Sequence, residues 1–548
     1  STAPADVFGS VTNLLSVWYD NPNNTTVEFI QNPDVMVPKQ DRKLTWFPDN
    51  PIISNLYAIH GGAAYLVHIG GTASTELVVT GEPVSAKINW QANSFNFVGF
   101  SLVKGQEPLF RDFFSADAAL AEQEIYTLVN DEWVAVTNPS QTMEQGKGFW
   151  IYCAGSSSFQ GPVTVQLDQG TGLHYGTALV EQNVQLHNNS EADAVITLSL
   201  SETLELYYAE FDPDTSTTQW QPFSVAPAKL TLNVAAGASQ KLRIGVRRAG
   251  LTAGQEYSAN ISITDNSGSL ITLPVSVTGI SHTGLWVGSA VISKVNQPAD
   301  PVDPTTPRPA GSNFTFRLIV HVDNTGQARL LKEVIQLWQE GGWIPDPDEQ
   351  GKKVADPDNP GHYVLLADNS RISQYSGAAL RDGRPVGRRI SSPAFGNFYA
   401  ETARPAADFG DWTKFTRVSS KELSGAFQPD GILAATLWLP MDDPTNPFIH
   451  AFHPGHSAPV RIDDPENPGQ DIWSQGQEKR FDIIRTIRLQ FSDQDEDGNL
   501  ISLFSGLNWG SSEAGGIYRE SIDGLRRERL EISGTFLLRR VSSAELVQ

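Results

Sequence analysis

The sequence predicts an all-β, mainly antiparallel protein made of β-domains in series, one of which is an immunoglobulin-like sandwich. Three observations lead to this fold class. A chain of 548 residues is too long for one hydrophobic core and suggests three or four domains. Its 46 Gly and 34 Pro residues suit many short strands joined by turns. Apolar and polar residues alternate along much of the chain, as they do in half-buried strands.

The first domain, residues 1–172, is rich in aromatic residues and punctuated by Gly. Residues 61–70 and 146–155 each open on Gly, carry aromatic residues in the middle and close on Gly. This likeness predicts a duplicated β unit, with chance similarity as the alternative. Within the same domain, residues 117–124 are expected to form a short helix.

The second domain, residues 173–281, shows the clearest alternation with a period of two. Apolar stripes recur at residues 196–200, 242–246 and 257–263, with clusters of turn residues between them. About seven strands in roughly 100 residues are typical of an immunoglobulin-like sandwich. We therefore expect two packed antiparallel sheets in this region.

The third domain, residues 282–548, is expected to be a larger antiparallel β-domain, a meander or a barrel, with acidic Pro-rich loops. Apolar residues share one face over residues 314–322 and again over residues 483–491. Residues 330–339 are interpreted as the strand that returns after the turn at 323–326, with a short helix as the alternative. The connections are too short for parallel crossovers, which favours antiparallel pairing.

Three loops of this domain share an Asp-Pro-x-Asn-Pro motif. They start at Asp356, Asp443 and Asp464, and a partial copy starts at Asp346. Asp before Pro favours a turn, and Pro stiffens the loop by fixing φ. Two interpretations remain open: rigid acidic loops that bind calcium or a partner, and turns that only reverse the chain.

The charge and the cysteine content restrict the partners and the compartment. The formal net charge of −23 repels phosphate backbones and anionic lipids, so we expect neither nucleic-acid binding nor membrane insertion. Cys153 is the single cysteine, so no intrachain disulfide can form. The chain begins at Ser1 rather than Met, which is consistent with a removed signal peptide or with a shortened chain. Together these features predict a bacterial protein that is secreted or held at the cell surface.

Two groups of residues are candidate metal ligands. His450, His453 and His456 recur every third residue, and an extended segment would place their imidazoles on one side. Such a set suits zinc or copper, with hydrogen bonding in a surface loop as the alternative. In the second group, Asp493, Asp495 and Asp497 precede Gly498 like the start of a calcium-binding loop. Phe504 stands where that loop needs a bidentate Glu, so only loose calcium binding or a plain turn is expected.

Two parts of the chain resemble sequences of large exported proteins of environmental bacteria. The first part is 95–100 with 125–126 and 146–153; the second is 285–288 with 316–323, 446–450 and 534–540. The resemblance is to an uncharacterised family of exported or cell-surface multi-β-domain proteins. It implies a compartment and an architecture, and it transfers no catalytic residue because no activity is established for that family.

No common catalytic motif for acyl transfer, phosphate binding, zinc proteolysis or dinucleotide binding occurs in the chain. The sequence therefore favours a non-enzymatic structural or adhesive component of a bacterial surface, filament or secreted matrix, with calcium as a stiffening ligand. Its partner would be another protein or further copies of the chain. A carbohydrate-binding or glycan-processing protein is one alternative, with Trp46, Trp90, Trp133, Trp150, Trp343 and Trp412 as sugar-stacking candidates. A metal-binding protein that uses the His450 loop is the other.

Overall fold

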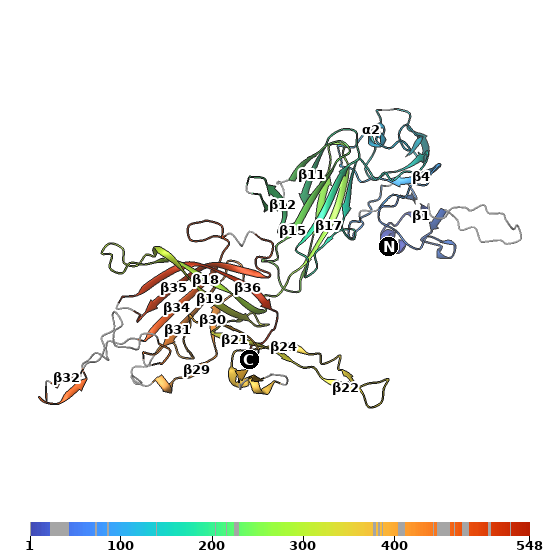
Figure 1. Ribbon diagram of the computed structural model, residues 1–548. Helices are drawn as coiled ribbons and strands as arrows, with labels where there is room; N and C mark the ends of the chain where they lie inside the picture. Colours follow the sequence, from blue (N-terminus) through green and yellow to red (C-terminus); the bar gives the residue numbers. More distant parts are fainter. Residues whose placement is uncertain are drawn as a thin grey trace. The chain divides into compact units, whose positions relative to one another are not determined.

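The structure is a computed structural model of the chain (Figure 1). It describes residues 2–21, 43–71, 74–84, 87–138, 140–202, 204–214, 216–223, 230–375, 380–381, 384–385, 387–403, 412–441, 443–446, 461–464, 466–473, 482–501, 506–525 and 528–548. Nearly all regular structure in these ranges is antiparallel strand, so the predicted all-β fold class is confirmed. No helix in them is long and apolar enough to cross a membrane. The chain divides into two compact units, Ser1–Val246 with Gln255–Gly279 and Arg247–Gly254 with Ile280–Gln548.

Two small sheets form the N-terminal part of the first unit. In one, β1 (Leu14–Asp20) lies between β2 (Lys43–Trp46) and β3 (Tyr65–Ile69). The other sheet has the strand order β4-β7-β5-β6, with bounds Ser94–Gly99, Gly148–Cys153, Ile125–Val129 and Glu132–Ala135. Short helices α1 (Pro4–Phe8), η1 (Pro51–Ile53) and α2 (Phe110–Phe114) accompany them. The two segments that suggested a duplication form β3 and β7, which lie in different sheets.

The helix expected at residues 117–124 is wrong, because these residues form turns. The side chain of Asp117 accepts a hydrogen bond from the backbone N–H of Ala119 (2.9 Å) and another from the Ser157 hydroxyl (2.7 Å). An Asp that bonds the backbone two residues on offers the chain a turn in place of a helix.

The rest of the first unit is the predicted sandwich of two five-stranded sheets. One sheet has the order β13-β12-β15-β10-β8 and the other β14-β11-β16-β17-β9. The strands are β8 (Val163–Leu167), β9 (Leu173–His174), β10 (Glu181–Asn188), β11 (Ala194–Leu200), β12 (Leu206–Asp212), β13 (Thr217–Phe223), β14 (Leu230–Val234), β15 (Ser239–Val246), β16 (Glu256–Thr264) and β17 (Leu270–Thr278). Ala194 and Ile196 of β11 are buried while Val195 between them is exposed, so the alternation read from the sequence sorts side chains between core and solvent.

A buried tyrosine joins the two sheets of the sandwich. Tyr175 follows β9 and is almost fully buried, and its hydroxyl donates a hydrogen bond to the Ile244 carbonyl of β15 (2.8 Å). Replacing Tyr175 with Phe is expected to lower the free energy of unfolding of the sandwich by about 1 kcal/mol, because a buried hydrogen bond is lost with little change of shape. Urea unfolding measures this, with the exposed Tyr363→Phe as the control. Equal midpoints for Tyr175→Phe and the parent chain would contradict it.

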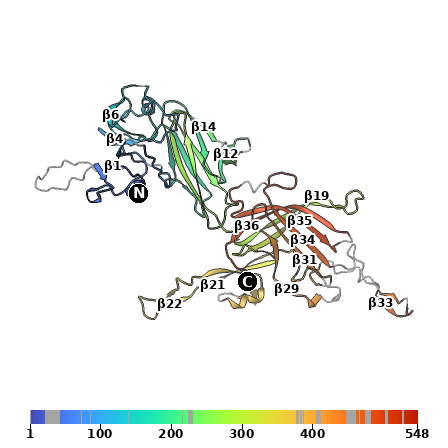
Figure 2. The same ribbon diagram turned by 180° about the vertical axis from the view of Figure 1, so that it is seen from behind.

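The second unit is built on a closed eight-stranded antiparallel barrel, seen from behind in Figure 2. Its strands, in barrel order, are β18 (Gly284–Val295), β19 (Arg308–Val322), β20 (Ala328–Leu331), β30 (Ser420–Gly425), β31 (Ile432–Leu439), β34 (Ile483–Phe491), β35 (Glu513–Asp523) and β36 (Leu530–Ser542). The barrel core contains Trp286, Leu318, Tyr518 and Phe536, all nearly inaccessible to solvent. Gly288 is required where β18 meets β36, since a Cβ there would lie 1.7 Å from the Leu537 carbonyl oxygen.

Between β20 and β30 the chain leaves the barrel and forms a side sheet. The order of this sheet is β24-β21-β27, with bounds His362–Leu366, Glu333–Gln339 and Arg388–Ser391. Short elements complete the excursion: β22 (Trp343–Pro345), β23 (Lys353–Ala355), η2 (Asn369–Gln374), β25 (Leu380–Arg381), β26 (Arg384–Pro385), β28 (Phe398–Tyr399), η4 (Trp412–Lys414) and β29 (Arg417–Val418). A further hairpin, β32 (Arg461–Asp463) with β33 (Asp471–Trp473), lies between β31 and β34. The side sheet and β28–β29 carry the pocket described next.

Candidate functional site

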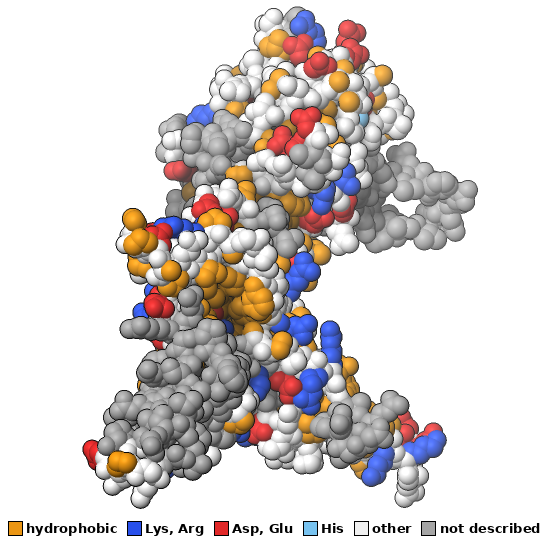
Figure 3. Space-filling view, turned by 60° about the vertical axis from the view of Figure 1, so that its left-hand side comes forward, with side chains coloured by type: hydrophobic (Ala, Val, Ile, Leu, Met, Phe, Trp, Pro, Cys, Tyr) orange, Lys and Arg blue, Asp and Glu red, His pale blue; other side chains and the backbone are white. Residues whose placement is uncertain are grey.

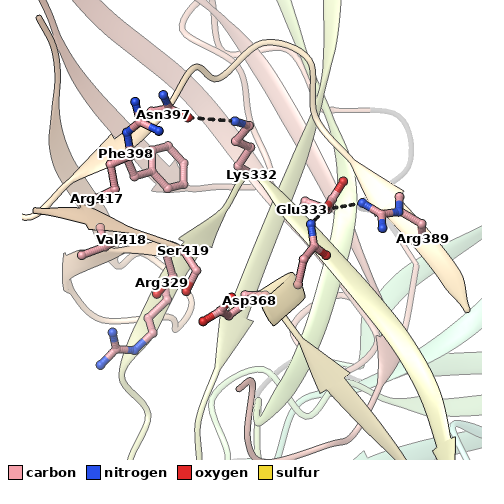
Figure 4. A pocket seen from close by; sticks show the side chains of 13 residues that line it. Arg329, Lys332, Glu333, Asp368, Arg389, Asn397, Phe398, Arg417, Val418 and Ser419 are labelled. Atoms are coloured by element: carbon pink, nitrogen blue, oxygen red, sulfur yellow. Dashed lines mark hydrogen bonds and ion pairs between the residues drawn. The ribbon is translucent and has the colours of Figure 1, made fainter. Parts of the chain in front are cut away.

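The second unit has a polar pocket where the barrel meets its side sheet (Figure 4). Its volume is about 980 Å³, comparable with sites that hold a small ligand or several side chains. Charged and amide side chains dominate its lining: Arg329, Lys332, Glu333, Asp368, Asn369, Arg389, Asn397 and Arg417. Figure 4 shows Lys332 and Asn397 toward one end of the pocket and Arg329, Asp368 and Ser419 toward the other.

The path of the chain places the cationic residues in the pocket. Ala328 and Leu330 of β20 point into the barrel core, so the alternation of a strand puts Arg329 on the outer face. Lys332 lies where the chain passes from β20 to β21, and Glu333 opens the side sheet. Arg389 on β27 and Arg417 on β29 come from later in the same excursion.

The charges lining the pocket do not cancel. Four cationic side chains face two acidic ones, although the whole chain carries a net charge of −23. Glu333 is neutralised by the guanidinium of Arg389 at 2.5 Å. Among the described residues, Lys332 Nζ donates only to the neutral Asn397 side chain (3.3 Å), and the Arg329 guanidinium makes no hydrogen bond or ion pair. Two cations thus remain available to an anion.

The second acidic residue of the lining, Asp368, is hydrogen-bonded to a residue next to it in the chain. Its Oδ1 accepts hydrogen bonds from the Ser370 N–H (2.9 Å) and hydroxyl (2.7 Å), which cap η2. The Ser370 side-chain and backbone hydrogen bonds lower the pKa of Asp368. On the face drawn in Figure 3, Lys and Arg side chains lie among Asp and Glu side chains without covering it as one charged surface. The excess of positive charge is therefore a local property of the pocket.

A buried carboxylate, Asp443, contacts two residues of the pocket lining, Asn397 and Arg417. Asp443 is fully inaccessible to solvent and accepts hydrogen bonds from the Tyr399 hydroxyl, the Asn397 amide (3.1 and 3.2 Å) and Thr445. Its Oδ2 lies 3.8 Å from the guanidinium of Arg417. Burial opposes ionisation, but these hydrogen bonds, the Thr445 hydroxyl first, outweigh it and lower the pKa of Asp443. Burial and the bond to Asp443 raise the pKa of Tyr399 to about 12. Asn397 connects this carboxylate to Lys332, so the cluster fixes the pocket wall.

The candidate metal ligands have different outcomes. His450, His453 and His456 lie outside the described residues. In the turn after β34, the Asp495 side chain accepts hydrogen bonds from two backbone N–H groups, those of Asp497 and Asn499 (both 2.9 Å). Asp497 pairs with Lys294 at 2.9 Å.

Asp493 belongs to the same turn, where its backbone carbonyl accepts from the Ile501 N–H (2.9 Å). Among the described residues, no three His, Cys, Asp or Glu side chains gather as a metal-binding group. Calcium at Asp493, Asp495 and Asp497, and zinc or copper at the histidines, stay predictions.

The Asp-Pro-x-Asn-Pro loops share one local geometry. In the loops that start at Asp356, Asp443 and Asp464, the Asp side chain accepts from the backbone N–H two residues on, at 2.6–3.0 Å. The N–H three residues on bonds to the backbone carbonyl of the same Asp. Asp346 makes the first of these bonds with Asp348 (2.8 Å). The motif therefore encodes a turn that reverses the chain. The other interpretation, that these loops bind calcium or a partner, stays a prediction.

The tryptophans proposed as a sugar platform are dispersed. Trp90 is buried, Trp46 is half-buried and Trp343 is exposed on β22. Trp133 and Trp150 lie on one face of the four-stranded sheet, and their rings meet at 74° with 6.3 Å between centroids. Rings that meet edge to face present less flat surface to a sugar than parallel rings do. Trp412 lies in η4, far along the chain from the others.

No pocket residue was singled out from the sequence. The cations come from three strands and from the connection between β20 and β21, and only the fold brings them together. One local signal existed: Arg381, Arg384, Arg388 and Arg389 fall within a single short stretch, and Arg389 reaches the pocket. The second missed feature, Asp443, carries the same motif as two exposed loops, so its burial has no local signature.

No family model and no curated protein matches the chain. Some solved structures show a distant likeness. A complex of the CsuC chaperone with the CsuE tip adhesion subunit from Acinetobacter baumannii aligns at 12% identity over 29% of this chain and 93% of that chain, with a TM-score of 0.15. A protein of unknown function from Bacteroides ovatus aligns at 8% identity over 69% and 93%, with a TM-score of 0.15. BcpA, the major pilin subunit of Bacillus cereus, aligns at 12% identity over 44% and 90%, with a TM-score of 0.16. We draw no conclusion from likenesses at these TM-scores.

Proposed function

We propose that this chain is a non-enzymatic structural or adhesive component of a bacterial surface, filament or secreted matrix, and that its second unit holds an anionic group of a partner in the basic pocket. The observation that supports this is the uncancelled positive charge of a pocket of about 980 Å³ on a chain of net charge −23. Arg329 and Lys332 are the residues that would receive the anion. Guanidinium and ammonium groups bind carboxylates through charge-assisted hydrogen bonds, which are stronger than neutral ones.

The pocket lining favours attachment over chemistry. Its one buried carboxylate neighbour, Asp443, has both oxygens occupied by Tyr399, Asn397 and Thr445. A general base must present a free lone pair to the proton it removes. The two carboxylates in the lining also have partners: Glu333 pairs with Arg389 (2.5 Å), and Asp368 Oδ1 accepts from the Ser370 N–H and hydroxyl. The other polar groups of the lining are cations, amides and hydroxyls, which bind and orient an anion.

The double variant Arg329→Gln, Lys332→Gln, which loses two charged hydrogen bonds, is expected to bind an acidic polymer about 100- to 10,000-fold more weakly than the parent chain. Each charged hydrogen bond contributes roughly 1.5–3 kcal/mol, and every 1.4 kcal/mol is about tenfold in Kd. Fluorescence anisotropy with labelled poly-L-glutamate measures the affinity at low salt. The matched control is Lys104→Gln, Lys241→Gln, which removes two exposed cations from the first unit. Equal losses in both double variants would contradict a role for the pocket.

A further inference from the structure

The basic pocket lies at one end of a two-stranded ladder. β21 and β24 pair antiparallel from Ile335 opposite Leu366 to Gln339 opposite His362. At the first end, Glu333 opens β21 and lines the pocket. Ala367 follows β24 directly and lines it as well. The pocket is thus fixed to the start of β21 and the finish of β24.

The opposite end of the ladder continues into the hairpin formed by β22 and β23. Beyond Gln339, the Gly342 N–H donates to the Asn359 carbonyl (2.9 Å), and the Asp356 N–H donates to the Gly342 carbonyl (2.9 Å). These bonds carry the ribbon on to Trp343, which pairs with Ala355. Figure 1 and Figure 2 show the β22–β23 hairpin leaving the side sheet and running away from the barrel.

The β22–β23 hairpin has features of a segment that docks on a partner: strands without further neighbours, an exposed aromatic ring and an acidic turn. Within the described residues its strands pair only with each other, and an isolated two-stranded hairpin is marginally stable in water. Trp343 at its base is 63% exposed. Its turn is acidic: Asp348 has no side-chain partner among the described residues, and Glu349 has only the exposed Lys352 at 2.5 Å. A hairpin with an exposed tryptophan at its base and exposed carboxylates in its turn suits a cationic recess, where Arg pairs with carboxylates and stacks on rings.

The hairpin cannot reach the pocket of its own chain. Seven residues of β21 span roughly 20 Å at about 3.3 Å per residue, and the hairpin extends the ribbon further in the same direction. A β22–β23 hairpin that enters the pocket must then come from a second copy. A contact between two different surfaces of identical chains repeats head to tail, and it forms a ring or an open filament.

We propose that the acidic turn of the β22–β23 hairpin of one copy enters the basic pocket of the next, so that the chain assembles head to tail. This rests on the proposed function, because it names the partner whose anionic group the pocket holds. Asp348 and Glu349 of one copy pair with Arg329 and Lys332 of the other. The charges of opposite sign stand at opposite ends of one ladder, so every added copy presents a new pocket and a new hairpin.

Complementary neutral variants test the proposal. One variant loses the pocket charges (Arg329→Gln, Lys332→Gln), and the other loses the turn charges (Asp348→Asn, Glu349→Gln). Sedimentation velocity of the full chain at low salt should show concentration-dependent oligomers for the parent and monomers for each variant alone. Mixed in equal amounts, the two variants should form a heterodimer and nothing larger, since each supplies one intact surface. High salt should dissolve the parent oligomers, because the Debye length falls to about 3 Å at 1 M.

Controls separate this proposal from the one it rests on. Glu466→Gln, in the exposed turn of the β32–β33 hairpin, should assemble as the parent does. If the parent binds poly-L-glutamate through the pocket but stays monomeric at every concentration, head-to-tail assembly is wrong and the anion-binding function stands. If the parent assembles but the pocket variant assembles equally well, the pocket is not the receptor for the hairpin and the head-to-tail pairing is wrong, while the poly-L-glutamate measurement still decides the anion-binding function. A mixture that grows beyond two copies also overturns the proposed pairing.

Discussion

Replacing Glu520 with Ala is expected to lower the free energy of unfolding of the barrel by about 3–5 kcal/mol. Glu520 is 2% exposed and forms a two-bond pair with the guanidinium of Arg485, whose second bond is 3.2 Å long. The Tyr518 hydroxyl also donates to it (2.7 Å). Removing the carboxylate leaves a desolvated cation without its counter-charge and a buried hydroxyl without its acceptor. An uncompensated buried charge accounts for most of the expected loss.

This ion pair also holds a segment that packs into the barrel core. Arg485 donates to the Ala394 carbonyl (2.6 Å), and its guanidinium lies 5.1 Å from the centre of the Phe395 ring. The prediction is checked by urea unfolding followed through the buried Trp286 and Trp438. Asp523→Ala, which breaks the exposed pair of Asp523 with Arg529 (2.8 Å), is the control and should cost less than about 1 kcal/mol. Similar small losses for both would show that the buried pair is not tightly coupled.

Replacing Asp443 with Asn should be the second large perturbation, with an expected loss of about 2–4 kcal/mol at neutral pH. The substitution puts an amide donor where Tyr399 and Asn397 donate to a carboxylate, and it leaves buried donors unsatisfied. Because the pKa of Asp443 is lower in the folded chain than in the unfolded one, its contribution is complete above the unfolded pKa of about 4. That contribution is lost as pH falls through the folded pKa. The parent barrel should therefore lose stability more steeply below about pH 4 than Asp443→Asn does.

Thermal unfolding from pH 7 down to pH 2 measures this difference in slope. Asp358→Asn is the matched control, since Asp358 lies exposed in the sister loop that starts at Asp356. It should leave both the midpoint at neutral pH and the acid slope unchanged. Parallel acid curves for the parent and Asp443→Asn would show that this carboxylate titrates alike in the folded and unfolded chains.

The fold class could be predicted from the sequence because apolar and polar residues alternate within each strand. This alternation arises because one face of the sheet packs against the core while the other faces solvent. Val195 points to solvent between the buried Ile196 and Ala194, as a period of two requires. The short helix expected at 117–124 failed for a local reason as well, since Asp117 bonds the backbone into a turn. Patterns of hydrophobicity therefore read correctly over whole sheets and less well over single turns.

The candidate site could not be predicted, because its residues meet only through topology. Arg329 and Arg417 lie on β20 and β29, and the whole side sheet intervenes between them in the chain. The three Asp-Pro loops show the same limit. Their hydrogen bonds follow from the motif, but only at Asp443 does the fold add Tyr399 and Asn397 and bury the carboxylate. The Asp-Pro-x-Asn-Pro motif determines the turn, and the residues packed around it determine whether its Asp side chain is exposed or buried.

Because the barrel is closed, substitutions on the outer face of the second unit can change binding without changing strand pairing or the core. Every one of its eight strands has a hydrogen-bonded neighbour on both sides, so none of them is an edge strand of the sheet. We therefore expect a partner of the barrel to be recognised by side chains on its outer face, such as Arg329. Those side chains can vary while the wall behind them keeps its pairing and its core. The barrel can therefore acquire a new partner through a few surface substitutions, without passing through a less stable fold.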